Sequence, residues 1–347
     1  MITLSVIAKR TGLTKTTVSR ILNHHDGYPR ATRDRVLKTA RELGYTPNPL
    51  SRALAGARSM SVGVLINSLD PLLAKALQAI ERHNADLGCR SYVAVTGHHA
   101  PAMDADTVRD LLARRVDGLL VDNDQALPAE ARTLLAEAGV PVVYLRTAPR
   151  HARLAVRIER RGAIKALVSR LKALGHQRVA YVRAADEAAL ASYYKPMLAE
   201  LRQAGMLEWQ DERWGLPTVR EGADAVISAD HVQEVYRMVS QLLQVGDYPT
   251  ALLFPDDEWA LAALAAARDC RVAVPEDLSI VGHDGHPLAA LASPALTTFH
   301  EPAAEAALLG AQLLQQAIGA EQPLAERAEH TLHAELVSGG TLGRART

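Results

Sequence analysis

Cysteine is nearly absent from this 347-residue sequence, which holds only Cys89 and Cys270. Neither cysteine lies in a Cys-x-x-Cys or Cys/His spacing, so a disulfide scaffold and a zinc site have no support. Aromatic residues make up only 4% of the chain, which leaves alanine and leucine to do most of the packing. No apolar run approaches the roughly 18 residues of a membrane span, and no secretory segment opens the sequence. We therefore expect a cytoplasmic protein that binds no membrane and needs no metal or cofactor.

The formal net charge is zero, but the charges are divided unevenly along the chain. Residues 1–58 contain 11 Lys or Arg and 3 Asp or Glu, whereas the remainder contains 28 and 36. A small basic segment on a larger acidic body is typical of proteins that bind a polyanion. A solvated basic tail is the alternative interpretation of the same composition. The length allows roughly two or three domains, each with its own core.

The first 45 residues predict three short helices that form a helix-turn-helix. The apolar spacing places the helices at about 4–11, 14–23 and 31–43. Thr14 is the expected N-cap of the second helix, because its hydroxyl can accept a hydrogen bond from a first-turn amide. Gly44 is the expected C-cap of the third helix.

The second helix exposes hydroxyls and cations, with no acidic residue among them. A helix that enters the major groove N-terminus first brings its first-turn side chains to the base edges. Lys15, Thr16 and Arg20 occupy that position, and Arg20 can pair with guanine through two hydrogen bonds. Thr14 and Ser19 suit phosphate oxygens or thymine methyl groups. The alternative is a small helical bundle with a solvated basic face.

The segment "TPNPLSRALAGARS" (46–59) predicts a further short helix between the headpiece and the body. Asn48 is a good N-cap, Pro49 fits the first helical position, and Gly56 fits the residue after the last turn. A helix of about seven residues is marginal in water, so it needs a partner to become ordered. Leu54 would be exposed on it and would suit an apolar wedge between base steps in the minor groove. A plain interdomain linker is the alternative.

The motifs "VIAKRTGLTKTTVSRILN", "TRDRVLKTARELGYTPN" and "LSRALAG" resemble, in order and spacing, the lactose/galactose-repressor family of bacterial transcription regulators. The resemblance implies base reading by Lys15, Thr16 and Arg20. It also implies a hinge helix that is ordered by DNA, with Asn48 at its start and Leu54 as the minor-groove lever. The phosphate or backbone contacts that it implies come from Thr3, Thr14, Ser19, Asn23 and Thr32.

Beyond residue 59, short apolar runs alternate with helical stretches. Strands are predicted at 61–66, 91–95, 116–121 and 140–145, and again at 178–182, 250–254 and 278–284. This alternation favours parallel sheets with helices on both faces, and two such series favour two subdomains with a cleft. In open sheets of this kind, ligands bind beyond the carboxyl ends of the strands. The residues at those ends are Asn67–Asp70, Arg146, Asp256–Asp257 and His283–Asp284.

The resemblance continues through "LGHQRVAYV", "PTALLFPDD" and "VPEDLSIVGHDGHPLAALASPALTTFHEP" to "HTLHAELVSGG", so it covers nearly the whole chain. It implies a periplasmic-binding-protein-like core, homodimerisation through that core and a small effector in the cleft. Asp256 and Asp284 match family positions that contact effectors. Two departures concern charge: Tyr193 stands where the family has a ligand-holding Arg, and Arg146 stands where it often has Asp.

Three interpretations of the effector site follow from these departures. Arg146 could hold an anionic effector, such as a sugar acid or a sugar phosphate. Arg146 could instead pair with Asp70 or Asp284, and the site would then bind a neutral sugar. In the third interpretation the cleft binds nothing tightly. Tyr193, Trp214 and Trp259 are candidates for stacking on a ligand, or for ordinary packing.

Proteins of other classes fit the sequence less well. An enzyme could use the His283, Asp284, His286, His300 and Glu301 side chains, but the sequence has no nucleophile elbow, P-loop or dinucleotide motif. A transport-type binding protein would need export and leaves the basic headpiece unexplained. An architectural DNA-binding protein would ignore small molecules.

We therefore predict a regulator and not an enzyme. Its expected fold is an N-terminal all-α helix-turn-helix headpiece plus an α/β periplasmic-binding-protein-like core of two doubly wound parallel-sheet subdomains. The expected domains are residues 1–45 for DNA binding, 46–58 for the hinge, and 59–347 for effector binding and dimerisation. The expected partners are double-stranded, pseudo-palindromic operator DNA, a sugar or sugar-acid effector, and a second copy of the chain.

Overall fold

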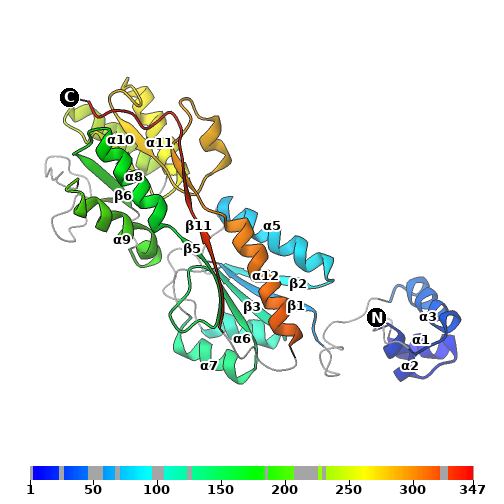
Figure 1. Cartoon of the computed structure of the whole chain (residues 1–347). Helices are drawn as coiled ribbons and strands as arrows, with labels where there is room; N and C mark the ends of the chain where they lie inside the picture. The colour runs from blue at the N-terminus through cyan, green and yellow to red at the C-terminus, as the bar shows by residue number, and fades with distance from the viewer. Residues whose placement is uncertain are drawn as a thin grey trace. The chain divides into compact units, whose positions relative to one another are not determined.

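The computed structural model describes residues 3–22, 27–45, 58–66, 71–95, 105–122, 127–183, 187–206, 226–228, 232–320 and 327–346. The chain divides into two compact units, Met1–Met60 and Ser61–Thr347 (Figure 1). In the described part of the chain, no helix combines the length and the apolar character that a membrane crossing requires.

The first unit consists of three helices around a small apolar core. The helices are α1 (Leu4–Thr11), α2 (Lys15–Leu22) and α3 (Arg30–Glu42). The predicted helices are confirmed. Apolar residues spaced three and four apart supply the buried core of each helix, although Leu4 and Leu37 on the predicted apolar faces are only half-buried. The buried apolar side chains come from all three helices: Ile7, Ala8, Val18, Ile21, Val36 and Ala40.

The end of α3 differs by one residue from the expectation. Leu43 is the C-cap and keeps right-handed helical geometry, and Gly44 lies one residue beyond it with φ of 65°. The Tyr45 amide then donates to the Ala40 carbonyl at 2.9 Å. The prediction of Gly44 as the cap was therefore wrong, because the left-handed turn that needs a glycine follows the cap residue.

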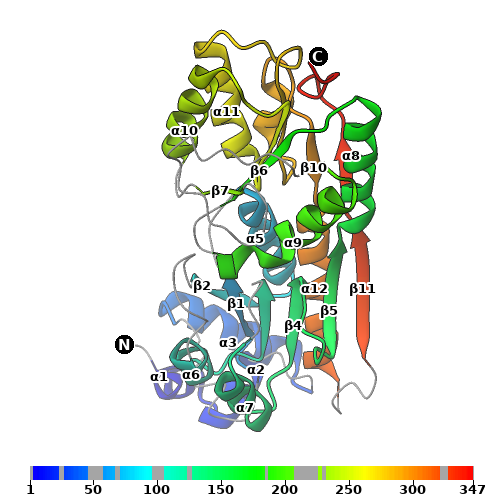
Figure 2. The same cartoon turned by 90° about the vertical axis from the view of Figure 1, so that its left-hand side faces the viewer.

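The second unit is built on two parallel sheets, as predicted. The larger sheet has the order β11-β5-β4-β3-β1-β2, and every adjacent pair is parallel. Figure 2 shows β1, β4, β5 and β11 with their arrowheads toward the second lobe. Its strands are β1 (Ser61–Ile66), β2 (Arg90–Val95), β3 (Gly118–Asp122), β4 (Val142–Arg146), β5 (Leu154–Glu159) and β11 (Ala328–His333).

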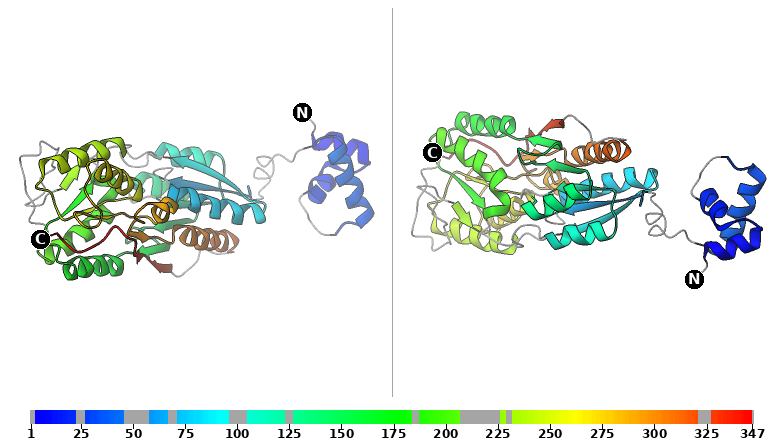
Figure 3. Two further views of the ribbon diagram at one scale, coloured as in Figure 1. Left: turned by 90° about the horizontal axis from the view of Figure 1, so that it is seen from above. Right: turned by 90° about the horizontal axis from the view of Figure 1, so that it is seen from below.

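Helices cover both faces of this sheet (Figure 3). Val62, Val64 and Ile66 of β1 join a core with α5 (Pro71–Asp86) and α12 (Ala303–Gly319), whereas Leu65 faces the core with α6 (Ala105–Ala113) and α7 (Ala129–Glu137). Successive side chains of a strand point to opposite faces, so a strand buried on both faces is apolar throughout. For this reason "SVGVLI" shows no polar alternation.

The second lobe contains a four-stranded parallel sheet of order β7-β6-β8-β9. Its core is divided between two faces, with α8 and α9 on one and α10 and α11 on the other. The strands are β6 (Val179–Arg183), β7 (Val226–Ser228), β8 (Ala251–Leu253) and β9 (Ser279–Val281). The helices are α8 (Arg161–Ala173), α9 (Glu187–Gln203), α10 (Val232–Val245) and α11 (Asp257–Asp269), with a 3-10 turn η2 (Pro287–Leu291).

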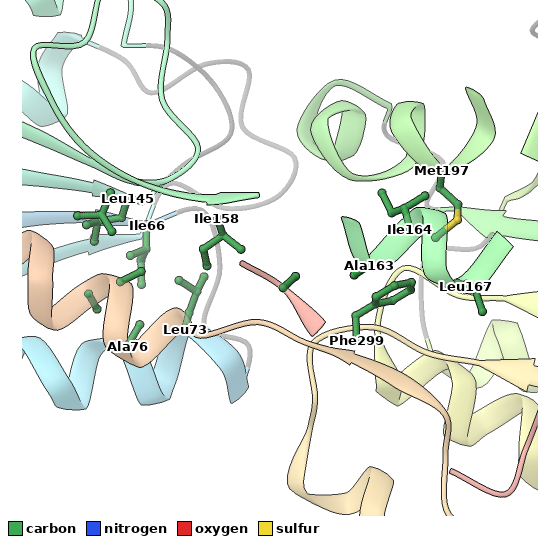
Figure 4. Packing of buried hydrophobic residues seen from close by; sticks show 14 of the residues in the cluster. Ile66, Leu73, Ala76, Leu145, Ile158, Ala163, Ile164, Leu167, Met197 and Phe299 are labelled. Carbon is green, nitrogen blue, oxygen red and sulfur yellow. The ribbon is translucent and has the colours of Figure 1, made fainter. Parts of the chain in front are cut away.

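Among the described residues, three segments of the chain cross between the lobes. They connect β5 to α8, β10 (Thr298–His300) to α12, and β11 to β12 (Glu335–Val337). The Ala334 amide donates to the Glu159 carbonyl at 2.9 Å, so two of the crossings are hydrogen-bonded to each other. One apolar cluster continues past them, from Ile66 and Ile158 to Ile164 and Phe299 (Figure 4). The crossings therefore run through packed core.

Candidate nucleic-acid interface and effector site

The predicted base-reading residues lie on the outer face of α2. Lys15, Thr16 and Arg20 are exposed, whereas Val18 and Ile21 on the inner face are buried. Thr14 precedes the helix, and its hydroxyl accepts a hydrogen bond from the Thr17 amide at 3.1 Å. This bond confirms Thr14 as the N-cap. The cap fixes the first turn, so Lys15 and Thr16 extend from a defined start of the helix.

The positive charge of α2 has no acidic neighbour on the same helix. The acidic residues in the described part of the first unit are Asp34 and Glu42, and both lie on α3. Each faces a cation one turn away on α3, with Asp34 at 3.9 Å from Arg30 and Glu42 at 4.0 Å from Lys38. The acidic side chains are thus paired on a different helix, and the α2 surface is left to attract phosphate.

The predicted phosphate contacts are only partly described. Thr3 is exposed at the start of α1, where its side chain does not cap the helix. Ser19 and Thr32 are half-buried on α2 and α3. The remaining predicted DNA contacts, Asn23, Asn48 and Leu54, lie outside the described residues.

Arg146 ends β4 and is buried together with Asp122, which ends the neighbouring strand β3. The Arg146 Nε donates to Asp122 Oδ1 at 2.7 Å. The sequence indicated Asp70 or Asp284 as the carboxylate partner of Arg146. The structure instead pairs Arg146 with Asp122, a carboxylate that the sequence analysis did not name. A buried guanidinium needs a carboxylate partner, and this pair supplies it within the protein.

Backbone strain marks two of the predicted effector residues. Arg146 has φ of 59° and Asp284 has φ of 93°, a region that side-chain-bearing residues rarely adopt. Such a conformation costs on the order of 1–3 kcal/mol and persists where the surroundings impose it. Arg146 ends β4 and Asp284 lies three residues beyond β9, at the edge where the α/β architecture places its ligands. The same conformation also occurs at Met60, Arg115 and Arg271, so the strain by itself does not assign a binding role.

Asp256 and Asp257 follow β8 and have different environments. Asp256 caps α11, and its carboxylate accepts from the Trp259 amide at 2.7 Å. Burial, opposed by that hydrogen bond, raises the pKa of Asp256 from 3.8 to about 7. Asp257 is buried, and it accepts from the Thr298 hydroxyl at 2.5 Å and from the His286 amide at 2.6 Å. Asp257 thus organises the loop, whereas Asp256 is the carboxyl whose charge changes near neutral pH.

The wild-type protein is expected to lose stability as the pH rises and Asp256 ionises, and Asp256→Asn is expected to abolish this loss. The pKa of Asp256 is higher in the folded protein than in the unfolded chain. The carboxyl therefore stabilises the fold fully below about pH 4, and this stabilisation is lost as the pH rises to about 7. At roughly 1.4 kcal/mol per pKa unit, the variant should gain about 2–4 kcal/mol over the wild type at pH 8. Asparagine keeps the helix cap. Urea unfolding at pH 5, 7 and 8 measures the difference.

Asp269→Asn serves as the control for this experiment. Hydrogen bonds from Tyr236 and Arg268 lower the pKa of the exposed Asp269 carboxyl, so its replacement should bring no gain at high pH. An Asp256→Asn variant whose stability follows the wild type at every pH would contradict the assigned pKa.

A buried ionic network lies where the lobes meet. Arg160, between β5 and α8, pairs with both carboxylate oxygens of Glu301, which follows β10. The His283 ring nitrogen Nε2 lies 2.9 Å from Glu301 Oε1. Burial by itself would raise the pKa of Glu301, but the Arg160 charge and the His283 hydrogen bond hold that pKa well below its usual range. The network joins two of the three crossings to the carboxyl end of β9.

The other predicted effector residues give less information. Asn67 and Asp70 lie outside the described residues, and Tyr193 lies in α9 with its side chain outside them. Trp259 is buried in the α10–α11 core, which favours ordinary packing over stacking on a ligand. Within the described ranges, no group of three metal-ligating side chains occurs.

Sequence reasoning missed three members of these sites. Asp122 follows from the strand-end rule, which was not applied to the strand predicted at 116–121. No sequence pattern indicated Arg160, because it stands beside Arg161 in a charged stretch and its partner is 141 residues away. Glu301 was considered only as a possible catalytic group, and its complete burial was not visible in the sequence.

These features define a class of protein: a DNA-binding transcriptional regulator with a helix-turn-helix headpiece and a two-lobed, binding-protein-like core. Residues 3–48 match the family model of bacterial regulatory proteins of the lacI family. Residues 168–342, half of the chain, match the model of the periplasmic binding protein-like domain. The chain belongs to the lacI family of bacterial regulatory proteins.

Individual relatives agree with this assignment. The chain is 28% identical to the lactose operon repressor of Escherichia coli (strain K12) over 342 residues, which cover 97% of this chain and 89% of that protein. A structure of the lac repressor dimer bound to operator and the anti-inducer ONPF superposes with a TM-score of 0.79 at 24% identity, over 98% of both chains. A transcriptional regulator CelR–cellobiose complex gives 0.64 at 25% identity, over 98% of this chain and 100% of that one. Such relatives are regulators and not enzymes.

Proposed function

We propose that this protein is a homodimeric repressor that binds a pseudo-palindromic operator and responds to a small carbohydrate effector. The observation that carries the proposal is the exposed, acid-free face of α2 in a capped helix-turn-helix. Lys15, Thr16 and Arg20 read base edges in the major groove. Thr3, Thr14, Ser19, Asn23 and Thr32 hold phosphates, and Asn48 and Leu54 order the hinge on the minor groove.

The effector that best fits the described charges is a neutral, hydroxyl-rich sugar. Arg146 is balanced by Asp122, and Arg160 by Glu301, so each of these buried cations already has a carboxylate. Asp256 and Asp284 supply acceptors for sugar hydroxyl groups, with Asn67, Asp70 and Tyr193 completing the site. A sugar phosphate or sugar acid would add negative charge beside these carboxylates. The related regulator CelR, whose structure is a complex with cellobiose, supports the same chemical class.

Exposed apolar side chains support a homodimer. Leu291 is 78% exposed and Leu288 52% exposed on η2, and Tyr92, Val93 and Val95 are exposed on the edge strand β2. An unpaired edge strand with apolar side chains is a surface that proteins usually cover. The second copy of this chain is the occupant that we propose, in line with the dimer seen for the lac repressor.

Effector binding would act on DNA through the crossings between the lobes. A sugar held by residues of both lobes favours a closed arrangement, and the lobes can only close by bending the three crossing segments. Effector binding and DNA binding are coupled if the open and closed arrangements differ in DNA affinity. Such a coupling free energy is typically about 1–3 kcal/mol, or 5–150-fold in affinity. Repression relieved by the effector is the direction that we propose.

The test combines a thermal-shift panel with a DNA-binding assay. Neutral sugars, sugar acids and sugar phosphates are each added to the full-length protein, and a ligand at 100 times its Kd should stabilise by about 2.7 kcal/mol. Selection from random duplexes should return a site with two-fold symmetric halves. The stabilising sugar should then weaken binding to the selected duplex. Stabilisation by anionic sugars alone would contradict the neutral effector, and selection without symmetry would contradict the dimeric operator.

A further inference from the structure

The amino ends of the strands in the larger sheet carry a row of arginines. Because the sheet is parallel, all six strands begin at one edge. Ser61 pairs with Arg90, the Asp117 amide donates to the Ser61 carbonyl, and the Ala328 amide donates to the Arg153 carbonyl. These pairings place the residues before each strand along one line. The exposed arginines on it are Arg90, Arg114, Arg115, Arg153 and Arg327, and the exposed Arg58, which belongs to the first unit, precedes β1 in the chain by three residues.

This row, which we call the basal arginine row, precedes or begins five of the six strands. Only β4 lacks such an arginine, because Pro141 precedes it. With strands about 4.8 Å apart, the row extends over roughly 24 Å. That length corresponds to about seven base pairs of duplex at 3.4 Å per pair.

The row is positive on a body that is negative overall. Outside residues 1–58 the chain carries 28 basic and 36 acidic residues. The described acidic residues at the basal edge are Asp86, Asp117, Glu137 and Glu329. Asp117 is engaged by the Ser61 amide at 3.4 Å, and Glu329 pairs with Arg327 at 2.9 Å. In the sequence Glu321 and Glu326 also come shortly before Arg327, outside the described residues. Over the whole edge the arginines and carboxylates are balanced. Arg58, Arg90, Arg114 and Arg115, which precede or begin β1, β2 and β3, outnumber the described carboxylates there, Asp86 and Asp117, so this part of the edge is basic.

The row has a polyanion within reach of the same chain. Arg58 is both a member of the row and the residue at which the chain leaves the segment after the headpiece. From Tyr45 to Arg58 the chain has 13 peptide links, which span at most about 45 Å when fully extended. This limited length raises the effective concentration of the core for DNA that the headpiece holds.

We propose that the basal arginine row is a second DNA-binding surface, which holds the phosphate backbone without reading sequence. This proposal rests on DNA binding by the headpiece and adds to it. Exposed arginines that neutralise phosphates strengthen binding and make it more sensitive to salt, but carry no base preference. The row would thus raise affinity for operator and for random duplex alike.

A different explanation is available for arginines at this edge. Helices α5, α6 and α7 end there, and cations stabilise the carbonyl groups at helix carboxyl ends. In that case the arginines would contribute to the stability of the core and not to DNA binding. Replacing the arginines distinguishes the two explanations. A DNA-binding role changes the salt dependence of DNA binding, whereas a helix-end role lowers the melting temperature.

The experiment measures binding of the full-length protein to a mixed-sequence duplex of about 40 base pairs between about 50 and 200 mM salt. The basal variant replaces four arginines by glutamine: Arg58→Gln, Arg90→Gln, Arg114→Gln and Arg115→Gln. The control variant makes the same change in charge on the second lobe: Arg202→Gln, Arg237→Gln, Arg268→Gln and Arg271→Gln. Arg115 and Arg271 both have φ near 56–59°, so the two sets are also matched in backbone strain.

The slope of log K against log salt should become shallower by about 0.9 for each phosphate that is no longer neutralised, or roughly 2–4 in the basal variant. The control variant should keep the wild-type slope. Preference for the selected operator over random duplex should be unchanged in the basal variant, whereas Arg20→Ala reduces it. If the basal and control variants have the same slope, the row is not a DNA surface, even where the headpiece binds normally.

Thermal unfolding of each variant completes the test. A lowered melting temperature with an unchanged salt slope would assign the row to helix ends and overturn the proposal. If the fourfold variant does not fold, Arg90→Gln with Arg114→Gln should still reduce the slope by about 1–2. Wild-type protein that binds no duplex at all would instead overturn the proposed function.

Discussion

Arg160→Ala is expected to lower the free energy of unfolding of the core by about 3–5 kcal/mol. The replacement leaves the Glu301 carboxylate fully buried with only His283 beside it. A buried charge without its partner destabilises far more than the pair stabilises, because the desolvation of the carboxylate is no longer offset. Urea unfolding followed by tryptophan fluorescence measures the core alone, since Trp209, Trp214 and Trp259 all lie beyond residue 60.

Arg178→Ala is the matched control. Arg178 also pairs with a carboxylate, at 2.7 Å from Asp247, but both side chains are substantially exposed. Its removal should change stability by less than about 1 kcal/mol. Adding Glu301→Gln to Arg160→Ala should restore part of the loss, because the buried charge is gone. Equal effects of the two arginine variants would show that the Arg160–Glu301 pair is not effectively buried.

The same pair predicts a dependence on pH. Arg160 and His283 lower the pKa of Glu301 in the folded protein. The ionised Glu301 therefore stabilises the fold above the ordinary glutamate pKa, and this stabilisation is lost as the pH falls toward the folded-state pKa. In Arg160→Ala the positive charge that lowers the Glu301 pKa is gone. Burial then raises this pKa and favours the protonated carboxyl. The difference in stability between wild type and variant should therefore shrink from pH 8 to pH 5.

Arg20→Ala is expected to weaken operator binding by about 1–3 kcal/mol and to relax preference at one base pair in each half-site. Arg20 is exposed on α2 and can donate two parallel hydrogen bonds to guanine. Competition between the selected operator and its single-base variants measures the effect. The loss should be concentrated at one position, because a bidentate pair discriminates only where it is formed.

Arg41→Ala is the control for Arg20→Ala. Arg41 is exposed at the end of α3, in the same unit, and its loss removes the same charge. It should weaken binding slightly and by the same factor at every sequence. If Arg20→Ala also weakens all sequences uniformly, then Arg20 binds phosphate and base reading must come from other residues of α2.

The local elements could be predicted from the sequence because their signals are local. Amphipathic spacing, the Thr14 hydroxyl and the glycines of the turns act over three or four residues, and the three headpiece helices follow from them. The two series of parallel strands were also visible, as apolar runs between helical stretches. β5 was missed because "LAVRIE" carries Arg157 and Glu159, polar residues that interrupt the apolar run.

The effector site was only partly predictable. The strand-end rule placed Arg146, Asp256 and Asp284 at the edge where the structure has strained or perturbed residues. It did not indicate how their charges are balanced. Arg146 could pair with several carboxylates, and the choice of Asp122 depends on β3 and β4 being neighbours in the sheet. Strand order is a property of the whole fold, and spacing along the chain does not encode it directly.

By itself, the sequence determined the class of this protein: a basic helix-turn-helix headpiece on an acidic, doubly wound core. Helix faces, caps and turns depend on residues close together in the chain, so the order and spacing of residues predict them. Only the tertiary structure decided which charges are neutralised and which are left for partners. Glu301 meets Arg160 across 141 residues, and arginines scattered from Arg90 to Arg327 align at one sheet edge. Burial and electrostatic pairing depend on distance in space, which the fold creates after the local elements have formed.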